Sequence, residues 1–580
     1  MKRLSIYLKK YSKESILAPF FKLLEALMDL MVPLVVARII NQGIALNDTG
    51  VIIRCFIFLI ALAVLGMCFS FTAQFFAAKA SVGFACDVRQ TLFDHIGSFS
   101  YSQMDHMGLD TLITRLTSDI NQMQTGLNLS LRLLLRSPFI VFGAMIMAFT
   151  IDSQIAMIFV IAIIVLCIVV FGIMLTSIPL FEKAQVALDK LLSILREDLT
   201  GVRVIRAFRK EEDEITQFDL KNEILKKINL TVSRLSALMN PLTYVIVNIA
   251  TIYLISKGAV KVDQGVIAQG DVVALYNYMA QIIIELIKLA SLIITINKSL
   301  ACSGRVSQIL AIEADMKYKK DIVQSNDSEY AVVFDDVSFA YNQSGEAAVK
   351  DISFEAKKGQ TIGIIGGTGS GKSTIINLIP RFYDADEGSV LINGIDVKDY
   401  PKGSLTDLIG IVPQKAVLFE GSIRDNLKWG NENASDDEIF EALKIAQALE
   451  VVERKEKKLD EHVEQNGRNF SGGQRQRLTI ARALVKKPEI LILDDSASAL
   501  DLATDLNLRK AIAALKDMTV FIVSQRSSSV RNCDLILVMD DGELKGKGTH
   551  EELMKDCKVY QEIYYSQYPE EAKKGGLSYE

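Results

Sequence analysis

A glycine-rich segment in the second half of the chain has the residue types that bind phosphate. Residues 366–373 read GGTGSGKS, which matches the P-loop pattern. The apolar run TIGII precedes this segment and the helical pattern TIINLI follows it, so the loop stands between a predicted strand and a predicted helix. The glycines allow backbone N–H groups to surround phosphate oxygens at a helix N-terminus. We expect Lys372 to reach the β- and γ-phosphates of a nucleotide and Ser373 to ligate Mg²⁺.

Two later segments carry groups that complete such a site. Ser471 begins the sequence SGGQ, and its hydroxyl can cap the helix predicted for RQRLTIARALV, which leaves free N–H groups directed at an anion. The apolar strand ILILDD includes Asp494, whose carboxylate can hold Mg²⁺ through water. A P-loop followed by SGGQ and then by a hydrophobic strand with Asp is far more specific than any one of these parts.

The composition indicates a membrane part joined to a soluble part. Half of the 580 residues are hydrophobic, yet 23% are charged. A chain of this length is too long for a single core, so two or more domains are expected. The net charge of -5 is small and the sequence has no broad basic face, which argues against nucleic acid as a partner. The seven cysteines show neither disulfide nor zinc spacing, and we interpret them as small core hydrophobes.

Apolar runs of about 20 residues, long enough to cross a bilayer, recur through the first half of the chain. The second and fourth continue as amphipathic helix, so the polar stretches 79–126 and 182–234 are predicted to be long helical extensions into the cytoplasm. Asn240 and Pro241 are expected to kink the fifth helix. The six predicted spans are 16–42, 51–78, 127–151, 155–181, 235–257 and 271–300.

The distribution of basic residues predicts the orientation in the membrane. The short turns 44–50 and 151–154 contain no Lys or Arg. The positive-inside rule therefore predicts a multi-pass protein of the cell membrane with both termini in the cytoplasm. The basic residues assigned to the opposite side are Arg115, Arg132, Arg136, Arg203, Arg206, Arg209 and Lys210.

The N-terminus has the pattern of a short amphipathic helix. Leu4, Tyr7, Leu8 and Tyr11 recur at helical spacing among lysines and an arginine, which favours a helix lying on the inner membrane surface. A solvated basic tail is the alternative.

The pattern changes near Ala311. Residues 313–330 are polar and form a predicted linker, and from Ala331 short β-rich runs alternate with helices. The nearly all-apolar runs favour buried parallel strands in an α/β domain. The strand candidates are AVVFDDVSFAY, QTIGIIGG, SVLINGI, LIGIVPQ, EILILDD, TVFIVSQ and LILVMDDGEL.

With these motifs in place, almost the whole chain resembles an ABC transporter of the exporter type, in which one membrane domain is fused to one ATPase domain. The resemblance implies an α-helical membrane domain at 1–312, with six transmembrane helices and long cytoplasmic extensions, and an α/β P-loop ATPase domain at 331–580. It also implies ATP and Mg²⁺ as cofactors. The residues expected to bind the phosphates are Gly366, Gly367, Thr368, Gly369, Ser370, Gly371, Lys372, Ser373 and Thr374.

The resemblance assigns further roles around the nucleotide. Tyr341 stands where the family stacks an aromatic ring on adenine, and Gln414 matches the glutamine that touches Mg²⁺ and senses the membrane domain. Ser373, Gln414 and Asp494 are thus the expected metal site. The segment 498–501 (SALD) matches the part that crosses the dimer interface. Residues 110–119 and 201–208 resemble the two cytoplasmic loop regions that press short coupling helices onto the ATPase domains.

Two positions depart from the family pattern in the same small site. Active members place Glu after the strand Asp, as the base that polarises water, and here that position is Asp495. The switch histidine is replaced by Gln525. Asp is one methylene shorter than Glu, and Gln cannot become cationic as His can. We expect ATP to bind and to be hydrolysed slowly, although Asp495 as an adequate base remains the alternative.

ABC domains work as head-to-tail pairs, with each ATP between one P-loop and the other chain's SGGQ. An intact SGGQ beside an altered base and switch favours a heterodimer with a second ABC half-transporter. The chain then resembles the degenerate-site subunit of bacterial heterodimeric multidrug exporters, carrying drugs or other amphiphiles. A lipid or peptide exporter and a non-transporting ATP-binding regulator are the alternatives. The residues that would contact the partner's ATP are Ser471, Gly472, Gly473 and Gln474.

Charged residues within the predicted spans bear on the cargo. Lys22, Glu25 and Asp29 share one face of the first helix, and Glu285 and Lys288 share one face of the sixth. Ionisable groups at membrane depth face a cavity or each other. One interpretation is an acidic cavity wall made by the three carboxylates, suited to cationic amphiphiles among membrane lipids. The other is Glu–Lys pairing along each helix.

Overall fold

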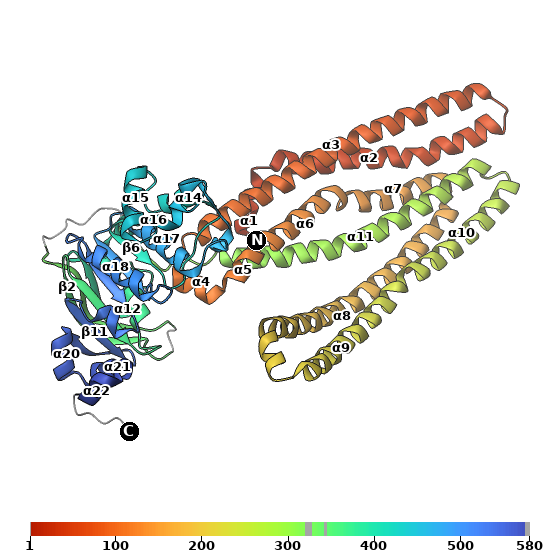
Figure 1. The fold of residues 1–580 in the computed structure, drawn as a ribbon. Coiled ribbons are helices and arrows are strands. Elements are labelled where there is room, and N and C mark those ends of the chain that lie inside the picture. The colour runs from red at the N-terminus through yellow and green to blue at the C-terminus, as the bar shows by residue number, and fades with distance from the viewer. Residues whose placement is uncertain (1, 320–327, 342–344, 575–580) are drawn as a thin grey trace. The chain divides into compact units, whose positions relative to one another are not determined.

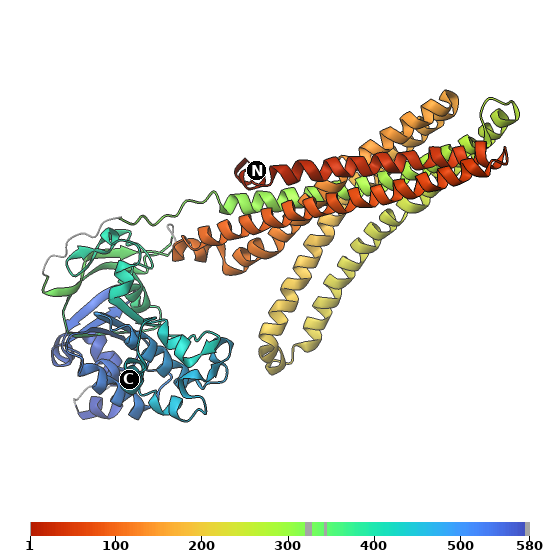
Figure 2. The ribbon, with the colours of Figure 1, turned by 90° about the horizontal axis from the view of Figure 1, so that it is seen from above.

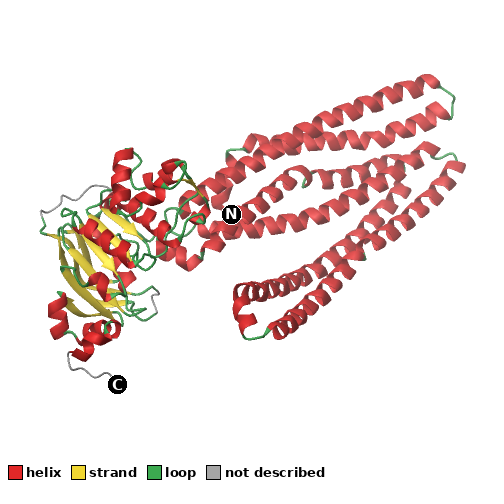
Figure 3. Ribbon diagram, in the orientation of Figure 1, coloured by secondary structure: helices red, strands yellow, loops and turns green. Residues whose placement is uncertain are grey.

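The computed structural model describes residues 2–319, 328–341 and 345–574, which form two compact units. The first unit comprises Met1–Gly97 and Leu109–Glu313, and the second comprises Ser98–Gly108 and Ala314–Glu580 (Figure 1). Residues 320–327 of the predicted linker and 575–580 of the tail lie outside the described residues. Among the described residues every named strand belongs to the second unit, whereas the first is helical (Figure 3).

Long helices make up the first unit. The second and fourth predicted spans do continue as long helices, because α3 has 48 residues and α8 has 55. The elements are α1 (Lys2–Lys9), α2 (Ser12–Arg38), the π-helical turn η1 (Ile39–Ile44), α3 (Thr49–Ile96), α5 (Leu109–Thr114), the π-helical turn η2 (Arg115–Asp119), α6 (Ile120–Leu133), α7 (Arg136–Ile151), α8 (Ser153–Ala207), α9 (Glu211–Ala237), α10 (Met239–Asp263) and α11 (Gln269–Ile309).

The helix ends follow from local chemistry. Asp48 accepts hydrogen bonds from the first N–H groups of α3, and Asp152 does the same for α8. The fifth predicted helix is interrupted at Leu238, between α9 and α10. Pro241 has no N–H to donate to the carbonyl of Ala237, which accounts for the break.

Five helical stretches among the described residues are long and apolar enough to cross a membrane. The first predicted span, 16–42, is helical but is not one of these five, and it carries Lys22, Glu25 and Asp29 midway along α2. A sixth span therefore remains a prediction. The five stretches are Thr49–Ile96, Leu109–Ile151, Ser153–Ala207, Glu211–Asp263 and Gln269–Ile309.

Small residues and a few buried rings hold the first unit together. Ala26 and Leu30 of α2, Ala144 of α7 and Tyr278 of α11 belong to one buried cluster. The Tyr278 hydroxyl donates a 2.7 Å hydrogen bond to the carbonyl of Leu30, so the one polar atom of this ring is satisfied. The α8–α9 hairpin packs chiefly on itself and on α10, and its far end extends away from the other helices of the unit (Figure 2).

A mainly parallel six-stranded sheet forms the centre of the second unit, in the order β12-β11-β3-β10-β9-β6. Only β12 pairs antiparallel. A second, antiparallel sheet has the order β2-β1-β4-β5. The strands are β1 (Tyr330–Phe339), β2 (Val349–Lys357), β3 (Thr361–Gly366), β4 (Glu387–Ile392), β5 (Ile395–Asp396), β6 (Ile409–Val412), β7 (Gly421–Ser422), β8 (His462–Val463), β9 (Ile490–Asp494), β10 (Thr519–Val523), β11 (Leu535–Asp540) and β12 (Glu543–Gly548).

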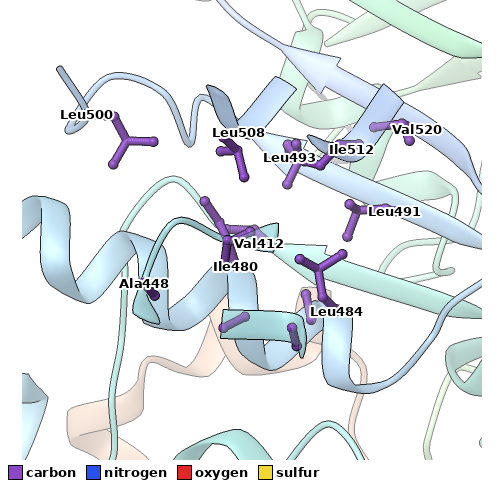
Figure 4. Packing of buried hydrophobic residues seen from close by; sticks show 14 of the residues in the cluster. Val412, Ala448, Ile480, Leu484, Leu491, Leu493, Leu500, Leu508, Ile512 and Val520 are labelled. Carbon is purple, nitrogen blue, oxygen red and sulfur yellow. The ribbon is translucent and has the colours of Figure 1, made fainter. Parts of the chain in front are cut away.

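The central strands are buried on both faces, which explains their nearly all-apolar sequences. Leu491 and Leu493 of β9 face one cluster, whereas Ile490 and Ile492 face the other. On the first face, Ile480 of α17 packs close to the strands (Figure 4). The helices of this unit are α4 (Tyr101–Met107), α12 (Lys372–Leu378), η3 (Val397–Asp399), α13 (Ser404–Leu408), α14 (Ile423–Lys428), α15 (Asp436–Ile445), α16 (Leu449–Glu453), η4 (Lys458–Asp460), η5 (Gln465–Gly467), α17 (Gly472–Val485), α18 (Leu502–Ala513), α19 (Ser527–Val530), α20 (His550–Asp556), α21 (Lys558–Gln567) and α22 (Pro569–Lys574).

Residues 98–108 differ from the sequence-based expectation, which placed them in the first domain. They include α4, and they belong with the second unit. The Tyr101 ring centroid is 4.7 Å from that of Phe382, and Tyr383 donates a 2.8 Å hydrogen bond to Asp105. Gly108, with φ at 75°, ends the helix in a conformation that glycine adopts without strain. The predicted extension 79–126 is therefore helical but interrupted.

Candidate functional site

The P-loop runs from β3 into α12, as its sequence predicts. Gly371 caps α12 with φ at 91°, and a Cβ there would lie 2.7 Å from the carbonyl oxygen of Ala348. A Cβ on Gly366 would lie 2.2 Å from the carbonyl oxygen of Met539. Only glycine fits these two positions, so the backbone can follow a tight path around an anion.

Lys372 lies within the loop rather than in solvent. Its ammonium donates to the carbonyl of Gly366 at 3.1 Å and to the Ser370 hydroxyl at 3.3 Å, and it also contacts the carbonyl of Gly367. Burial lowers the pKa of Lys372, and the charges of Asp495 and Asp494 oppose that shift. The Lys372 ammonium is thus held inside the P-loop by hydrogen bonds to oxygens of the loop itself.

Asp494 stands at the end of β9, next to the start of α12. The Ser373 hydroxyl and Asp494 Oδ1 are 3.5 Å apart. Burial raises the pKa of Asp494, and the neighbouring charge of Asp495 raises it further. A hydroxyl and a carboxylate this close are hard oxygen donors that fit Mg²⁺. The described residues contain no group of three or more His, Cys, Asp and Glu side chains suited to a metal.

Asp495 is held in an unusual backbone conformation. Its φ is 43°, a region that non-glycine residues rarely adopt, and its N–H donates to the carbonyl of Val523 at 3.0 Å. Burial raises the pKa of its carboxyl, while a hydrogen bond from Gln414 and the charges of Arg526 and Lys372 oppose the rise.

Tyr341 lies beside the P-loop, and Gln525 lies at the same edge of the sheet. Tyr341 is 45% exposed, and its hydroxyl is 3.2 Å from that of Thr374, so the ring is available to stack beside the loop. Parallel pairing sets Val523 of β10 opposite Asp494 of β9, which puts Gln525 two residues beyond the strand end. Gln525 is exposed.

Arg526 is a residue of this site that the sequence reasoning missed. It follows Gln525 directly, and its charge acts on the Asp495 carboxyl. The available signal was a cation adjacent to the position where a histidine was expected.

The SGGQ segment caps α17 as predicted. The Gln474 N–H donates to the Ser471 hydroxyl at 3.3 Å, and the Ser471 N–H donates to the Gln474 side chain at 3.0 Å. Within the described part of the chain, no hydrogen bond or ion pair joins Ser471, Gly472, Gly473 or Gln474 to the P-loop. One chain does not bring these two halves of the predicted site together.

The predicted acidic wall contains a cation that the sequence analysis had assigned to the cytoplasmic side. Arg136 donates to Glu285 at 2.6 Å and to Asp29 at 2.9 Å, and it links α2, α7 and α11. The predicted Glu–Lys pairs are present too, with Lys22 2.5 Å from Glu25 and Lys288 2.9 Å from Glu285. Three cations thus accompany three carboxylates.

A groove of about 600 Å³ lies between α2 and α3. Glu25 and Asp29 line it together with Met28, Met67 and Phe71, whereas Lys22 and Arg136 do not. Glu285 is 3% exposed and is not among the lining residues either. The groove therefore combines apolar walls with two carboxylates, whose cationic partners are not among the lining residues.

Comparisons with known proteins agree with this architecture. The ABC transporter transmembrane region matches residues 15–286, and the ABC transporter domain matches residues 349–498. The chain is 35% identical to the uncharacterised ABC transporter ATP-binding protein YfiB of Bacillus subtilis over 571 residues, which cover 98% of this chain and 99% of that one. It is 32% identical to the ATP-dependent lipid A-core flippase of Desulfotalea psychrophila, over 83% of this chain and 84% of that protein.

A solved structure of a bacterial Atm1-family ABC exporter with ATP bound has the same fold. Its TM-score to this chain is 0.77 at 24% identity, over 96% of this chain and 98% of that one. Helical transmembrane and α/β nucleotide-binding domains are thus fused in the same manner.

The environment of Asp494 predicts that Asp494→Asn stabilises the nucleotide-free protein but reduces the stabilisation that MgATP provides. When the pKa of an aspartate is higher in the folded than in the unfolded protein, the ionised carboxylate destabilises the folded state. This loss of stability is present above the unfolded-state pKa, and it disappears as the pH falls through the folded-state pKa. Asp494→Asn should therefore raise the melting temperature of the nucleotide-free protein at pH 7, with a smaller gain at acid pH.

With MgATP at about 100 times Kd, the wild type should gain about 2.7 kcal/mol, and the variant distinctly less. Thermal unfolding of the purified chain measures both effects, with the exposed Asp517→Asn as control. A lower nucleotide-free melting temperature together with an unchanged MgATP shift would contradict this account.

Proposed function

From the premise that the chain belongs to the ABC transporter family, we propose that it is the regulatory half of a heterodimeric exporter. An ABC ATPase domain fused to an exporter-type transmembrane region makes it an ATPase-coupled, multi-pass membrane transporter. In this role its own ATP site hydrolyses slowly, and its SGGQ completes the active site of a related partner. We assign 1–312 to the membrane domain, 331–580 to the ATPase domain, and both termini to the cytoplasm.

The environment of Asp495 carries the proposal of slow hydrolysis. A base that polarises water must reach the water next to the γ-phosphate, and an aspartate carboxylate sits about 1 Å further back than that of a glutamate. Such a displacement can cost about 10²-fold in rate. A hydrogen bond from Gln414 and the charges of Arg526 and Lys372 also lower the pKa of Asp495, which makes its carboxylate a weaker base.

Gln525 weakens the same step. A histidine at this position can become cationic and stabilise the charge that develops on the γ-phosphate, whereas a glutamine amide donates only a neutral hydrogen bond. The two changes act on one transition state and in the same direction.

The chain's own residues support binding of MgATP. We propose that Tyr341 stacks on adenine and that the backbone N–H groups of 366–374 hold the phosphates. Lys372, already inside the loop, would transfer its hydrogen bonds from loop carbonyls to phosphate oxygens. Bound Mg²⁺ neutralises phosphate charge, and Ser373, Asp494 and Gln414 would hold it.

Two observations favour a partner. The SGGQ segment is intact, but among the described residues no hydrogen bond or ion pair joins it to the P-loop of its own chain. The α8–α9 hairpin also exposes large apolar residues, among them Leu199 at 68% and Phe208 at 73%. Exposed apolar residues of this kind mark interaction surfaces. A second half-transporter with Glu and His in place of Asp495 and Gln525 would supply the faster site.

The groove between α2 and α3 favours an amphiphilic cargo such as a cationic drug, because Glu25 and Asp29 interrupt otherwise apolar walls. A lipid cargo is the second candidate, and the similarity to a lipid A-core flippase favours it.

The first test concerns the isolated chain. Purified alone, it should show little ATPase activity, because both of its sites would be slow ones. Co-expression with a half-transporter that carries Glu and His at the two altered positions should restore turnover by about 10²-fold. The control is the same pair with Lys372→Ala in this chain only, which should retain most of the activity. Rapid hydrolysis by the chain alone would exclude the heterodimer.

The second test is Asp495→Glu in the co-expressed pair. The longer side chain should raise turnover at this site only in part, because Gln525 still cannot become cationic. Single-turnover ATP hydrolysis measures it, with the partner's own site inactivated. Gln525→His combined with Asp495→Glu should give the larger increase. Full activity from the single change would show that Gln525 has no effect on the rate.

The third test addresses the cargo. Asp29→Asn should lower export of a lipophilic cation about tenfold, which corresponds to about 1.4 kcal/mol and lies within the range for charges about 4 Å apart. Glu25→Gln should act in the same direction. Export of a neutral analogue serves as the internal control, and Asp213→Asn on the exposed face of α9 as the matched variant. Equal losses for the cation and the neutral analogue would reject the groove as a cation-selective site.

A further inference from the structure

The turn that follows β10 is held by a residue from the far end of the chain. The side-chain N–H of Gln567, the last residue of α21, donates to the carbonyl of Gln525 at 2.8 Å. Its side-chain oxygen accepts from the N–H of Ser527 at 2.8 Å and from the Ser527 hydroxyl at 2.9 Å. One amide therefore bridges the residues on both sides of Arg526.

The turn's own residues hold it only in part, through the Arg526 N–H, which donates to the Ser524 hydroxyl at 3.0 Å. The short helix α19 begins at Ser527, and its N-cap residue Arg526 makes no side-chain capping hydrogen bond. Ser527 is fully buried, and an unpaired N–H there would cost free energy. Gln567 supplies the missing acceptor from outside the helix, and its donor group fixes the carbonyl of Gln525 at the same time.

The helix that carries Gln567 is firmly anchored. Tyr560 and Tyr564 of α21 are 0% and 2% exposed. His550 Nδ1 lies 2.8 Å from the Tyr560 hydroxyl, and the Arg531 guanidinium lies 5.8 Å from the centre of the Tyr564 ring. These contacts hold the end of α21 in place, so Gln567 can fix the position of the turn after β10.

We propose that Gln567 is a positioning residue for recognition of the γ-phosphate. By fixing the backbone on either side of Arg526, it sets the direction in which the exposed Gln525 side chain leaves the sheet edge. ATP carries the γ-phosphate and ADP does not, so this contact contributes to the preference for ATP over ADP. The inference rests on the proposed function, in which Gln525 donates to the γ-phosphate.

The deciding variant is Gln567→Glu in the full-length purified chain. A glutamate of the same shape keeps an acceptor for Ser527, so the domain is expected to fold, but it replaces the donor to Gln525 with an oxygen that repels the carbonyl. The matched control is Gln561→Glu on the same helix. Gln561 donates to the carbonyls of Met554 and Lys555 and makes no contact with the turn.

The measurement is the ratio of the dissociation constants of MgADP and MgATP. Gln567→Glu should lower this ratio about tenfold by weakening ATP binding, because the hydrogen bond from Gln525 to the charged γ-phosphate would be misdirected. ADP binding should stay unchanged, which also shows that the site is folded. Gln561→Glu should leave the ratio unaltered, and Gln525→Ala should lower it by itself.

Non-additivity separates positioning from a general structural effect. When Gln525→Ala is present, Gln567→Glu should have no further effect on the ratio, because the two residues act through one contact. If Gln525→Ala lowers the ratio while Gln567→Glu does not, or if the two effects add, this inference is overturned and the proposed function stands. If Gln525→Ala leaves the ratio unchanged, the proposed role of Gln525 fails and the inference fails with it.

Discussion

Parallel pairing of β3, β10 and β9 is the constraint on which the nucleotide site depends. Val523 of β10 lies opposite Ile364 of β3 and Asp494 of β9, so three strands end at one edge of the sheet. The P-loop, the carboxylates and Gln525 leave the sheet there because carboxyl ends of parallel strands coincide. A slip of one residue would exchange the two buried faces of a strand and move its terminal residue away from the others. The hydrophobic layers above and below the sheet therefore also fix the site geometry.

Sequence patterns were sufficient to predict the elements at this sheet edge, because each motif is typical of one local structure. A strand, a glycine loop and a helix in that order predict the P-loop, and ILILDD predicts a buried strand that ends near Asp494. The strand β2 was missed, because its alternating sequence VKDISFEAK has only one apolar face. It pairs antiparallel with β1, at the side of the domain where strands are half covered.

Contacts between distant residues could not be predicted in the same way. Nothing in the sequence near Arg136 indicates that it would meet Asp29 and Glu285, which lie more than a hundred positions away. The positive-inside rule uses only the place of a basic residue along the sequence, and it does not consider which carboxylates the cation meets in the folded chain. Gln567 is a similar case, because its partners lie 40 and 42 residues earlier in the chain.

The segment 98–108 has a consequence for how the chain can be divided. It belongs with the second unit, although its neighbours on both sides along the chain belong with the first. The polypeptide therefore passes between the units at three separate places, and the second unit is assembled from two discontinuous pieces. A fragment that begins at Ala314 would lack α4 and would leave Phe382 and Tyr383 without the ring of Tyr101. The second unit is in this sense not one continuous stretch of the chain, since it includes a short piece that synthesis delivers more than two hundred residues before the rest.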